Sequence, residues 1–200
     1  MSEDYLSSLN DSEKAAVLYN DGPALVIAGA GSGKTRVLVY KLLHLIRSGY
    51  DPARLMALTF TNKAAKEMKE RVASEIGPAA YRIQMGTFHS VFSRILRENA
   101  THLGYTRDFS IYDTNDTKSL LRHVMKRMNI DDKVYRLNAV QHRISMAKNQ
   151  LISPESYAVN KDLSRYDIDC RMPRMAEIYS LYTILCKQNN AMDFDDLLFK

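Results

Sequence analysis

The stretch ALVIAGAGSGKTR, residues 24–36, constrains the fold of this chain more than any other. The apolar residues 24–28 predict a short buried strand, and the helical pattern VLVYKLLHLI follows the glycines. A strand, a glycine-rich turn and a helix in this order form the context of a phosphate-binding loop. Glycine lets backbone N–H groups approach an anion, and the start of a helix presents its positive end to it. The stretch therefore predicts a nucleotide phosphate site rather than a plain strand-to-helix turn.

The predicted loop consists of Ala28, Gly29, Ala30, Gly31, Ser32, Gly33, Lys34 and Thr35. The usual pattern is G-x-x-x-x-G-K-[ST], and Ala28 takes its first position, which the broader form of the motif allows. We expect Lys34 to reach the β- and γ-phosphates of ATP and Thr35 to offer its hydroxyl to Mg²⁺. These two side chains are the candidate catalytic residues.

The composition indicates a folded globular protein but does not identify a binding partner. The chain has 200 residues, 46% of them hydrophobic and 26% charged, which suits one large domain or one and a half small ones. The net charge of +5 permits a polyanionic partner but does not require one. Cys170 and Cys186 lack the spacing of a zinc site or a disulfide framework, which fits a reducing compartment. Without a signal peptide or a membrane-length apolar run, we expect a soluble, cytoplasmic protein.

Strand and helix patterns alternate three times in the first half of the chain. Predicted strands at 24–28, 54–59 and 82–86 are each followed by a predicted helix, at 37–46, 63–76 and 87–96. Before them, Asn10 and Glu13 have the spacing of a capping box. The alternation predicts an α/β fold with a parallel sheet, in which ligands bind at the carboxyl ends of the strands.

From about Phe109 onward the strand signals vanish. Residues 115–128, 137–149, 154–160 and 172–189 are predicted helices and form a separate all-helical subdomain. Its basic residues are interpreted either as a solvated face or as a partner site. Residues 192–200, MDFDDLLFK, look like the start of another core element. No later strand ends in the Asp-Glu pair that a phosphate-loop ATPase needs, which favours the front piece of a longer enzyme over a nucleotide binder without turnover.

Five segments together resemble one family. LNDSEKAAV, AGAGSGKTRVL, LTFTNKAAKEMKERV, GTFHSVFSRILR and MDFDDLL occur in the order and spacing of the UvrD/Rep/PcrA-type superfamily 1 DNA helicases, from Leu9 to the last residue. The resemblance implies an α/β fold with a RecA-like phosphate-loop core and an inserted all-helical subdomain. It implies residues 1–108 as the first part of core domain 1A, 109–190 as the helical insertion 1B, and 191–200 as the return to 1A.

The resemblance also extends the nucleotide site. Arg36 matches a family arginine that lies by the base or the ribose. Glu13 stands where the family has the glutamine that reads adenine, and this is a departure. Glutamine can pair with both N6 and N7 of adenine, whereas an ionised glutamate only accepts hydrogen bonds. We therefore expect less strict adenine selection, unless Glu13 is protonated or serves only the capping box.

Two further motifs imply contacts with single-stranded DNA. Phe60, Thr61 and Asn62 match a strand-gripping motif, in which an exposed Phe60 would stack on a base; the alternative is a core residue. Thr87, His89 and Ser90 match a second motif that would bind phosphate oxygens; the alternative is a capping Thr87 and a structural His89.

Two features of the last 60 residues complete the candidate set. Lys148, in ISMAKN, is the candidate phosphate contact near the duplex. Asp193, Asp195 and Asp196 are interpreted as helix capping, so no metal is predicted beyond the Mg²⁺ that accompanies ATP.

The predicted function is that of an ATP-dependent DNA helicase, present as its N-terminal nucleotide- and DNA-binding part. The resemblance implies movement in the 3′ to 5′ sense, with single-stranded DNA and single-to-double-strand junctions as partners and no membrane. Two alternatives stay open, namely a helicase–nuclease subunit with a similar front end and a non-catalytic DNA-binding module with a vestigial loop. The chain alone is expected to bind nucleotide weakly and not to unwind DNA.

Overall fold

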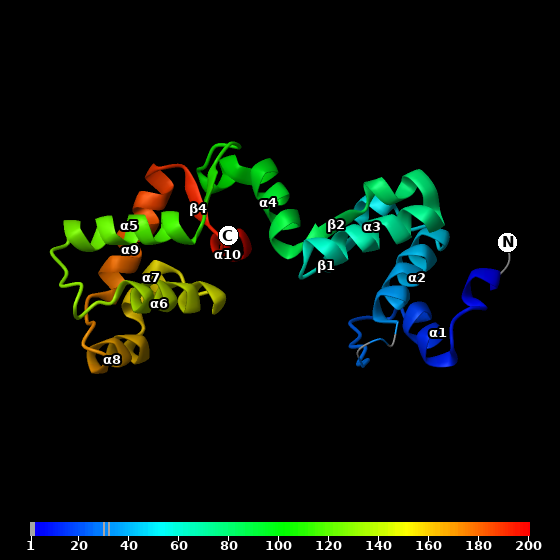
Figure 1. Ribbon diagram of the computed structural model, residues 1–200, viewed down its shortest axis with the longest axis horizontal. Helices are drawn as coiled ribbons and strands as arrows, with labels where there is room; N and C mark the ends of the chain where they lie inside the picture. Colours follow the sequence, from blue (N-terminus) through cyan, green and yellow to red (C-terminus); the bar gives the residue numbers. More distant parts are fainter. Residues whose placement is uncertain (1–2, 30, 32) are drawn as a thin grey trace. The chain divides into compact units, whose positions relative to one another are not determined.

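The computed structural model describes residues 3–29, 31 and 33–200 (Figure 1). The chain folds into two compact units, Met1–Val91 and Phe92–Lys200. Each is described below by itself. The predicted boundaries at 1–108, 109–190 and 191–200 belong to the implied helicase architecture and stay a prediction.

The first unit holds a pair of short parallel strands. β1 (Met56–Thr59) pairs with β2 (Gln84–Thr87), from Met56 opposite Gln84 to Thr59 opposite Thr87. The predicted strands at 54–59 and 82–86 and their parallel pairing are thus confirmed. The helices that begin in this unit are α1 (Asp11–Leu18), α2 (Lys34–Arg47), α3 (Asn62–Ile76) and α4 (Phe88–Asn99), the last of which continues into the second unit.

The core of the first unit lies between α2, α3 and the strand pair. Its buried side chains include Val39, Leu42, Ala57, Met68, Val72 and Met85. Met68 and Val72 are four residues apart on the helix predicted at 63–76, and they mark the inner face of α3. Thr61 caps this helix, because its Oγ1 accepts a hydrogen bond from the backbone N–H of Ala64 at 3.2 Å.

The strand predicted at residues 24–28 is not formed. Leu25 and Ile27 are 87% and 90% exposed, and the segment has no strand hydrogen bonding. A strand needs a neighbour to satisfy its backbone N–H and C=O groups. The strands described in this unit, β1 and β2, pair only with each other. An apolar run that pairs with none of these strands therefore stays an irregular loop.

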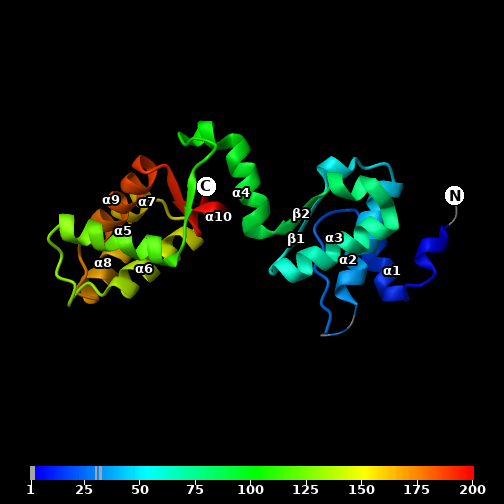
Figure 2. The same ribbon diagram turned by 45° about the horizontal axis from the view of Figure 1, so that its top comes forward.

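The second unit is mainly helical, with one more pair of parallel strands (Figure 2). β3 (Ser110–Tyr112) pairs with β4 (Ala191–Asp193). The α-helices that lie wholly in this unit are α5 (Thr114–Arg127), α6 (Leu137–Asn149), α7 (Pro154–Val159), α8 (Lys161–Asp169), α9 (Met175–Gln188) and α10 (Asp196–Phe199). The predicted helices at 115–128, 137–149, 154–160 and 172–189 are confirmed, whereas α8 and both short strands were missed.

Helices α5, α6, α7 and α9 enclose the larger core of the second unit. Its largest fully buried side chains are Tyr179, Tyr182, Leu121, Met175 and Ile178. A second cluster joins the end of α4 to β4 and α10 through Leu96, Phe109, Met192 and Leu197. Across the described residues, we find no helix with the length and apolar character needed to span a membrane.

Candidate nucleotide and nucleic-acid sites

The predicted phosphate-binding loop leads directly into α2. Gly33 is the N-cap of this helix with φ of +80°, and Gly31 has φ of +78°. Glycine adopts this left-handed conformation without the steric cost that a Cβ would bring. Ala30 and Ser32 lie outside the described residues. In the described part of the loop, Gly31 and Gly33 therefore adopt a backbone conformation that favours glycine.

Lys34 folds back over the loop. Its Nζ donates hydrogen bonds to the carbonyl oxygens of Ala28 at 2.9 Å and Gly29 at 2.5 Å. Thr35 is exposed in the first turn of α2, where backbone N–H groups and the positive end of the helix favour an anion. An ammonium, a hydroxyl and a helix start at one place fit a magnesium-bound triphosphate in donor type and charge.

A pocket of about 730 Å³ lies beside the loop. Three segments line it, namely α1, the stretch up to Gly29 and the first turns of α2. The structure thereby brings together four residues predicted for the nucleotide site, which are Glu13, Ala28, Gly29 and Lys34. Three of these residues belong to the predicted loop, so what the pocket adds is that Glu13 lies at the same site.

Glu13 has a place in both α1 and the pocket. Its Oε2 accepts the backbone N–H of Asn10 at 2.9 Å, and the Asn10 side chain accepts the backbone N–H of Glu13 at 2.9 Å. The predicted capping box is therefore confirmed. The other carboxylate oxygen, Oε1, would lie 3.1 Å from a Cβ placed on Gly33. The Glu13 side chain therefore lies close to Gly33, at the end of the predicted phosphate-binding loop.

The contacts of Arg36 differ from the predicted role beside the nucleotide, and Lys41 lies at the pocket without having been predicted there. The Nη2 of Arg36 donates to the carbonyl oxygen of Ser8 at 2.6 Å, so that its guanidinium is engaged away from the pocket lining. Lys41, which sequence reasoning did not select, lines the pocket and donates from Nζ to the carbonyl oxygens of Val17 and Tyr19. Partial burial lowers the pKa of Lys41. Its position two turns after Lys34, on the same face of α2, was the signal available in the sequence.

The first predicted DNA motif lies at the carboxyl end of β1. Phe60 directly follows this strand and is 92% exposed, so the alternative of a core residue is wrong. The ring centroids of Phe60 and Phe88 are 5.5 Å apart with an interplanar angle of 35°. An exposed aromatic ring at the ligand-binding edge of a parallel pair suits stacking with a base.

The polar residues of both motifs lie at the starts of α3 and α4. The Oγ1 of Thr87 accepts the backbone N–H of Ser90 at 3.3 Å, and the Ser90 hydroxyl donates to the Thr87 carbonyl at 2.9 Å. Thr87 is thus a capping residue, as Thr61 is on α3. Asn62 and Ser90 are exposed, and His89 is half-buried in the first turn of α4. The structure brings both motifs to neighbouring helix starts, and their DNA contacts stay a prediction.

Lys148 is buried rather than displayed. It is 3% exposed, and its Nζ lies 2.6 Å from Oδ2 of Asp193 and 2.9 Å from Oδ1 of Asp196. The hydroxyl of Tyr182 also donates to Oδ2 of Asp193 at 2.7 Å. These contacts account for the lysine without a phosphate, and we leave it out of the proposed DNA interface.

The two aspartates cap each other's backbone, as predicted for this segment. Asp196 N–H donates to Oδ1 of Asp193 at 2.9 Å, and Asp193 N–H donates to Oδ2 of Asp196 at 3.2 Å. Burial alone would lower the pKa of Lys148, but the two carboxylates outweigh it and raise that pKa. Burial acts to raise the pKa of Asp193. The attraction of the Lys148 ammonium outweighs burial, so the pKa of Asp193 is lowered. The Lys148–Asp193 pair therefore stays charged.

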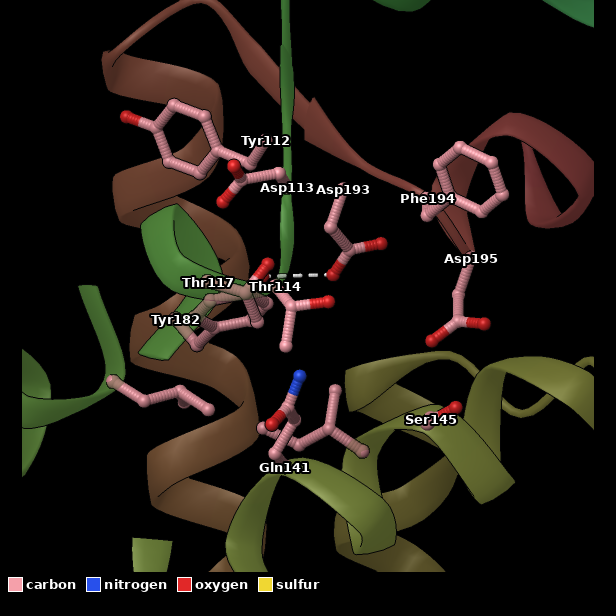
Figure 3. Close-up of a pocket in the computed structure, with 12 residues that line it drawn as sticks. Tyr112, Asp113, Thr114, Thr117, Gln141, Ser145, Tyr182, Asp193, Phe194 and Asp195 are labelled. Carbon is pink, nitrogen blue, oxygen red and sulfur yellow. Dashed lines mark hydrogen bonds between the residues drawn. The ribbon is translucent and has the colours of Figure 1, made fainter. Parts of the chain in front are cut away.

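A small pocket of about 150 Å³ lies beside this ion cluster (Figure 3). Tyr112, Thr117, Gln141, Ser145, Tyr182 and Asp195 are among its lining residues. The dashed line in Figure 3 marks the hydrogen bond from Tyr182 to Asp193. In the part of the chain that the structure describes, no group of three or more histidine, cysteine or acidic side chains is placed to hold a metal ion.

Comparison with known proteins identifies the family of the chain. The family model for the UvrD/REP helicase N-terminal domain matches residues 9–200, so the chain belongs to this family. The chain is 41% identical over 199 residues to the ATP-dependent DNA helicase PcrA of Bacillus subtilis (strain 168), which covers 99% of this chain and 26% of that protein. It is also 41% identical over 194 residues to the PcrA of Staphylococcus aureus (strain Mu50), with 96% and 26% covered. The chain therefore spans about a quarter of the length of these curated relatives.

Proposed function

We propose that this chain is the front part of an ATP-dependent DNA helicase and binds both nucleotide and single-stranded DNA. One observation carries the proposal. The first unit contains the glycine-rich loop with Lys34 at the start of α2 and, on the same unit, an exposed Phe60 at the carboxyl end of β1. The matched relatives are named as ATP-dependent DNA helicases, which supports the proposed function.

In the nucleotide site, Lys34 would exchange its loop carbonyls for phosphate oxygens. Its present partners, the carbonyl oxygens of Ala28 and Gly29, belong to the loop itself, which supports a role of the ammonium at this loop. Thr35 would hold Mg²⁺, which supplies positive charge to the β- and γ-phosphates. The Glu13 carboxylate would contact the nucleotide from α1, which lines the same pocket.

In the DNA site, one base would stack on Phe60 while the phosphates on either side reach the starts of α3 and α4. Helix starts attract phosphate through free N–H groups and the helix dipole, and stacking tolerates any base. Contacts of this kind grip a strand without reading its sequence. A translocating enzyme needs such sequence-tolerant contacts, and the 3′ to 5′ direction is proposed from the family resemblance.

In the longer protein, ATP would bind between this RecA-like half and a second one. Hydrolysis would open and close that cleft and pass the strand along. The Asp-Glu pair that activates the attacking water in phosphate-loop ATPases would come from the longer protein. The chain alone is therefore proposed to bind nucleotide weakly and not to unwind DNA.

Two titrations of the chain test the proposal. Calorimetry with Mg·ATP is expected to give saturable binding, and fluorescence anisotropy with an oligothymidylate is expected to give binding that weakens with salt. Phe60→Ala should weaken strand binding by about five- to a hundredfold, the range that stacking of one base supports. The exposed Tyr81→Ala is the matched control. Absence of both binding activities would contradict the proposal.

The longer protein separates a helicase from a non-catalytic DNA-binding module. Strong stimulation of its ATPase activity by single-stranded DNA is expected of the helicase. No stimulation would favour the module, although the intact Lys34 and Thr35 argue for a working nucleotide site.

A further inference from the structure

Phe60 and Phe88 leave the sheet at equivalent positions. Thr59 and Thr87 are the last paired residues of β1 and β2, and each phenylalanine is the next residue in its chain segment. Because the two strands run parallel and in register, both rings emerge at the same edge. The contact between them, 5.5 Å from centroid to centroid, is therefore set by the pairing of the strands.

The two rings differ in how firmly the fold holds them. Phe60 is 92% exposed, whereas Phe88 is half-buried at the first position of α4. The hydrogen bonds between Thr87 and Ser90 fix the turn that carries Phe88. A nearly bare ring samples several rotamers, and ordering it on binding costs entropy. Phe88 is the aromatic neighbour in a position to limit that freedom.

We propose that Phe88 is a positioning residue for Phe60, which holds the exposed ring in the orientation that accepts a base. This inference rests on the proposed binding of single-stranded DNA by Phe60. The tilted contact leaves almost the whole Phe60 surface free, so Phe88 orients the platform without covering it. Phe88 contributes through Phe60 and does not itself need to touch the strand.

The proposal predicts a specific dependence between the two residues. Phe88→Leu keeps apolar bulk but removes the flat ring, and it should weaken oligonucleotide binding by about two- to tenfold, the range expected for ordering one side chain. Phe88→Tyr keeps the ring and should bind as the unaltered chain does. In a Phe60→Leu background, Phe88→Leu should have no further effect, because the residue that it orients is gone.

The experiment is a double-mutant cycle on the complete chain with a single-stranded oligonucleotide that carries 2-aminopurine, a base whose fluorescence is quenched by stacking. Affinity is read by anisotropy, and stacking by the quenching at saturation. Phe88→Leu should reduce the quenching at saturation, which a merely structural loss of folded protein would not change. Circular dichroism checks each variant, and Phe88→Met replaces Phe88→Leu if the latter unfolds.

Two results overturn the inference in distinguishable ways. If the unaltered chain binds but Phe88→Leu either has no effect or has the same effect with and without Phe60, Phe88 does not act through Phe60, and the proposed strand binding still stands. If the unaltered chain does not bind the oligonucleotide at any salt concentration, the proposed strand binding and this inference both fail.

Discussion

The ammonium of Lys148 lies 2.6 Å from the Oδ2 of Asp193, although 45 residues separate the two along the chain. Lys148 comes from the last turn of α6, and Asp193 ends β4. The intervening residues form α7, α8 and α9, so this pair joins the two ends of that helical excursion. Both side chains are buried, and a buried charge is costly unless it is paired.

Replacing Lys148 should therefore destabilise the second unit strongly. Lys148→Met keeps the volume but leaves Asp193 buried without its cation and Asp196 with only Lys200, whose Nζ lies 4.0 Å from Oδ1 of Asp196. We expect a loss of about 3–5 kcal/mol in the free energy of unfolding, measured by urea denaturation. Lys126→Met, at an exposed position on α5, is the control and should change stability by no more than about 0.5 kcal/mol. Equal effects of the two substitutions would show that the pair does not stabilise the fold.

Local patterns predicted the parts of this structure whose partners are close in sequence. The capping box of Asn10 and Glu13 and the helix over 137–149 both depend on spacings of four residues or fewer. The predicted phosphate-binding loop likewise consists of consecutive residues, so its pattern can be recognised in the sequence. These features therefore needed no knowledge of the tertiary fold.

The features that were missed depend on distant partners. Residues 24–28 look like a strand, but pairing decides whether a strand forms, and none of the described strands pairs with them. β3 and β4 have only three residues each, too few to show a period, and they are defined by each other. Likewise, Lys148 looked like a surface cation because nothing local indicates Asp193. The Phe60–Phe88 contact also follows from strand register rather than from either motif.

Lys34→Ala should weaken the binding of Mg·ATP by about ten- to a hundredfold, because a charge-assisted hydrogen bond to phosphate is lost. Calorimetric titration of the chain measures this change. Lys66→Ala removes an exposed lysine from α3 and should leave nucleotide affinity unchanged. Since Lys34 also bonds the carbonyls of Ala28 and Gly29, circular dichroism should accompany the titration. Wild-type affinity in Lys34→Ala would refute the assigned phosphate site.

Glu13→Gln should raise the preference for ATP over GTP by about two- to tenfold, the value of one added hydrogen bond. The amide can donate to adenine N7 as well as accept from N6, which the carboxylate cannot do. Glutamine also serves at this position of a capping box, so α1 should keep its stability. Parallel titrations with ATP and GTP measure the ratio. An unchanged ratio in a variant that binds both nucleotides would place Glu13 outside base recognition.

His44 should make the first unit less stable in mild acid. Burial lowers the pKa of His44 from its usual 6.5, and the nearby Lys41 ammonium lowers it further. Folding therefore favours the neutral imidazole, whose Nδ1 lies 2.8 Å from the Tyr5 hydroxyl. The contribution of neutral His44 to stability is complete above the pKa that His44 has in the unfolded chain. It is lost as pH falls from that value toward the lower pKa that His44 has in the folded chain. Thermal unfolding between about pH 7.5 and 5.5 should show a smaller fall in Tm for His44→Gln than for the unaltered chain. Equal falls in Tm would mean that folding does not change the pKa of His44.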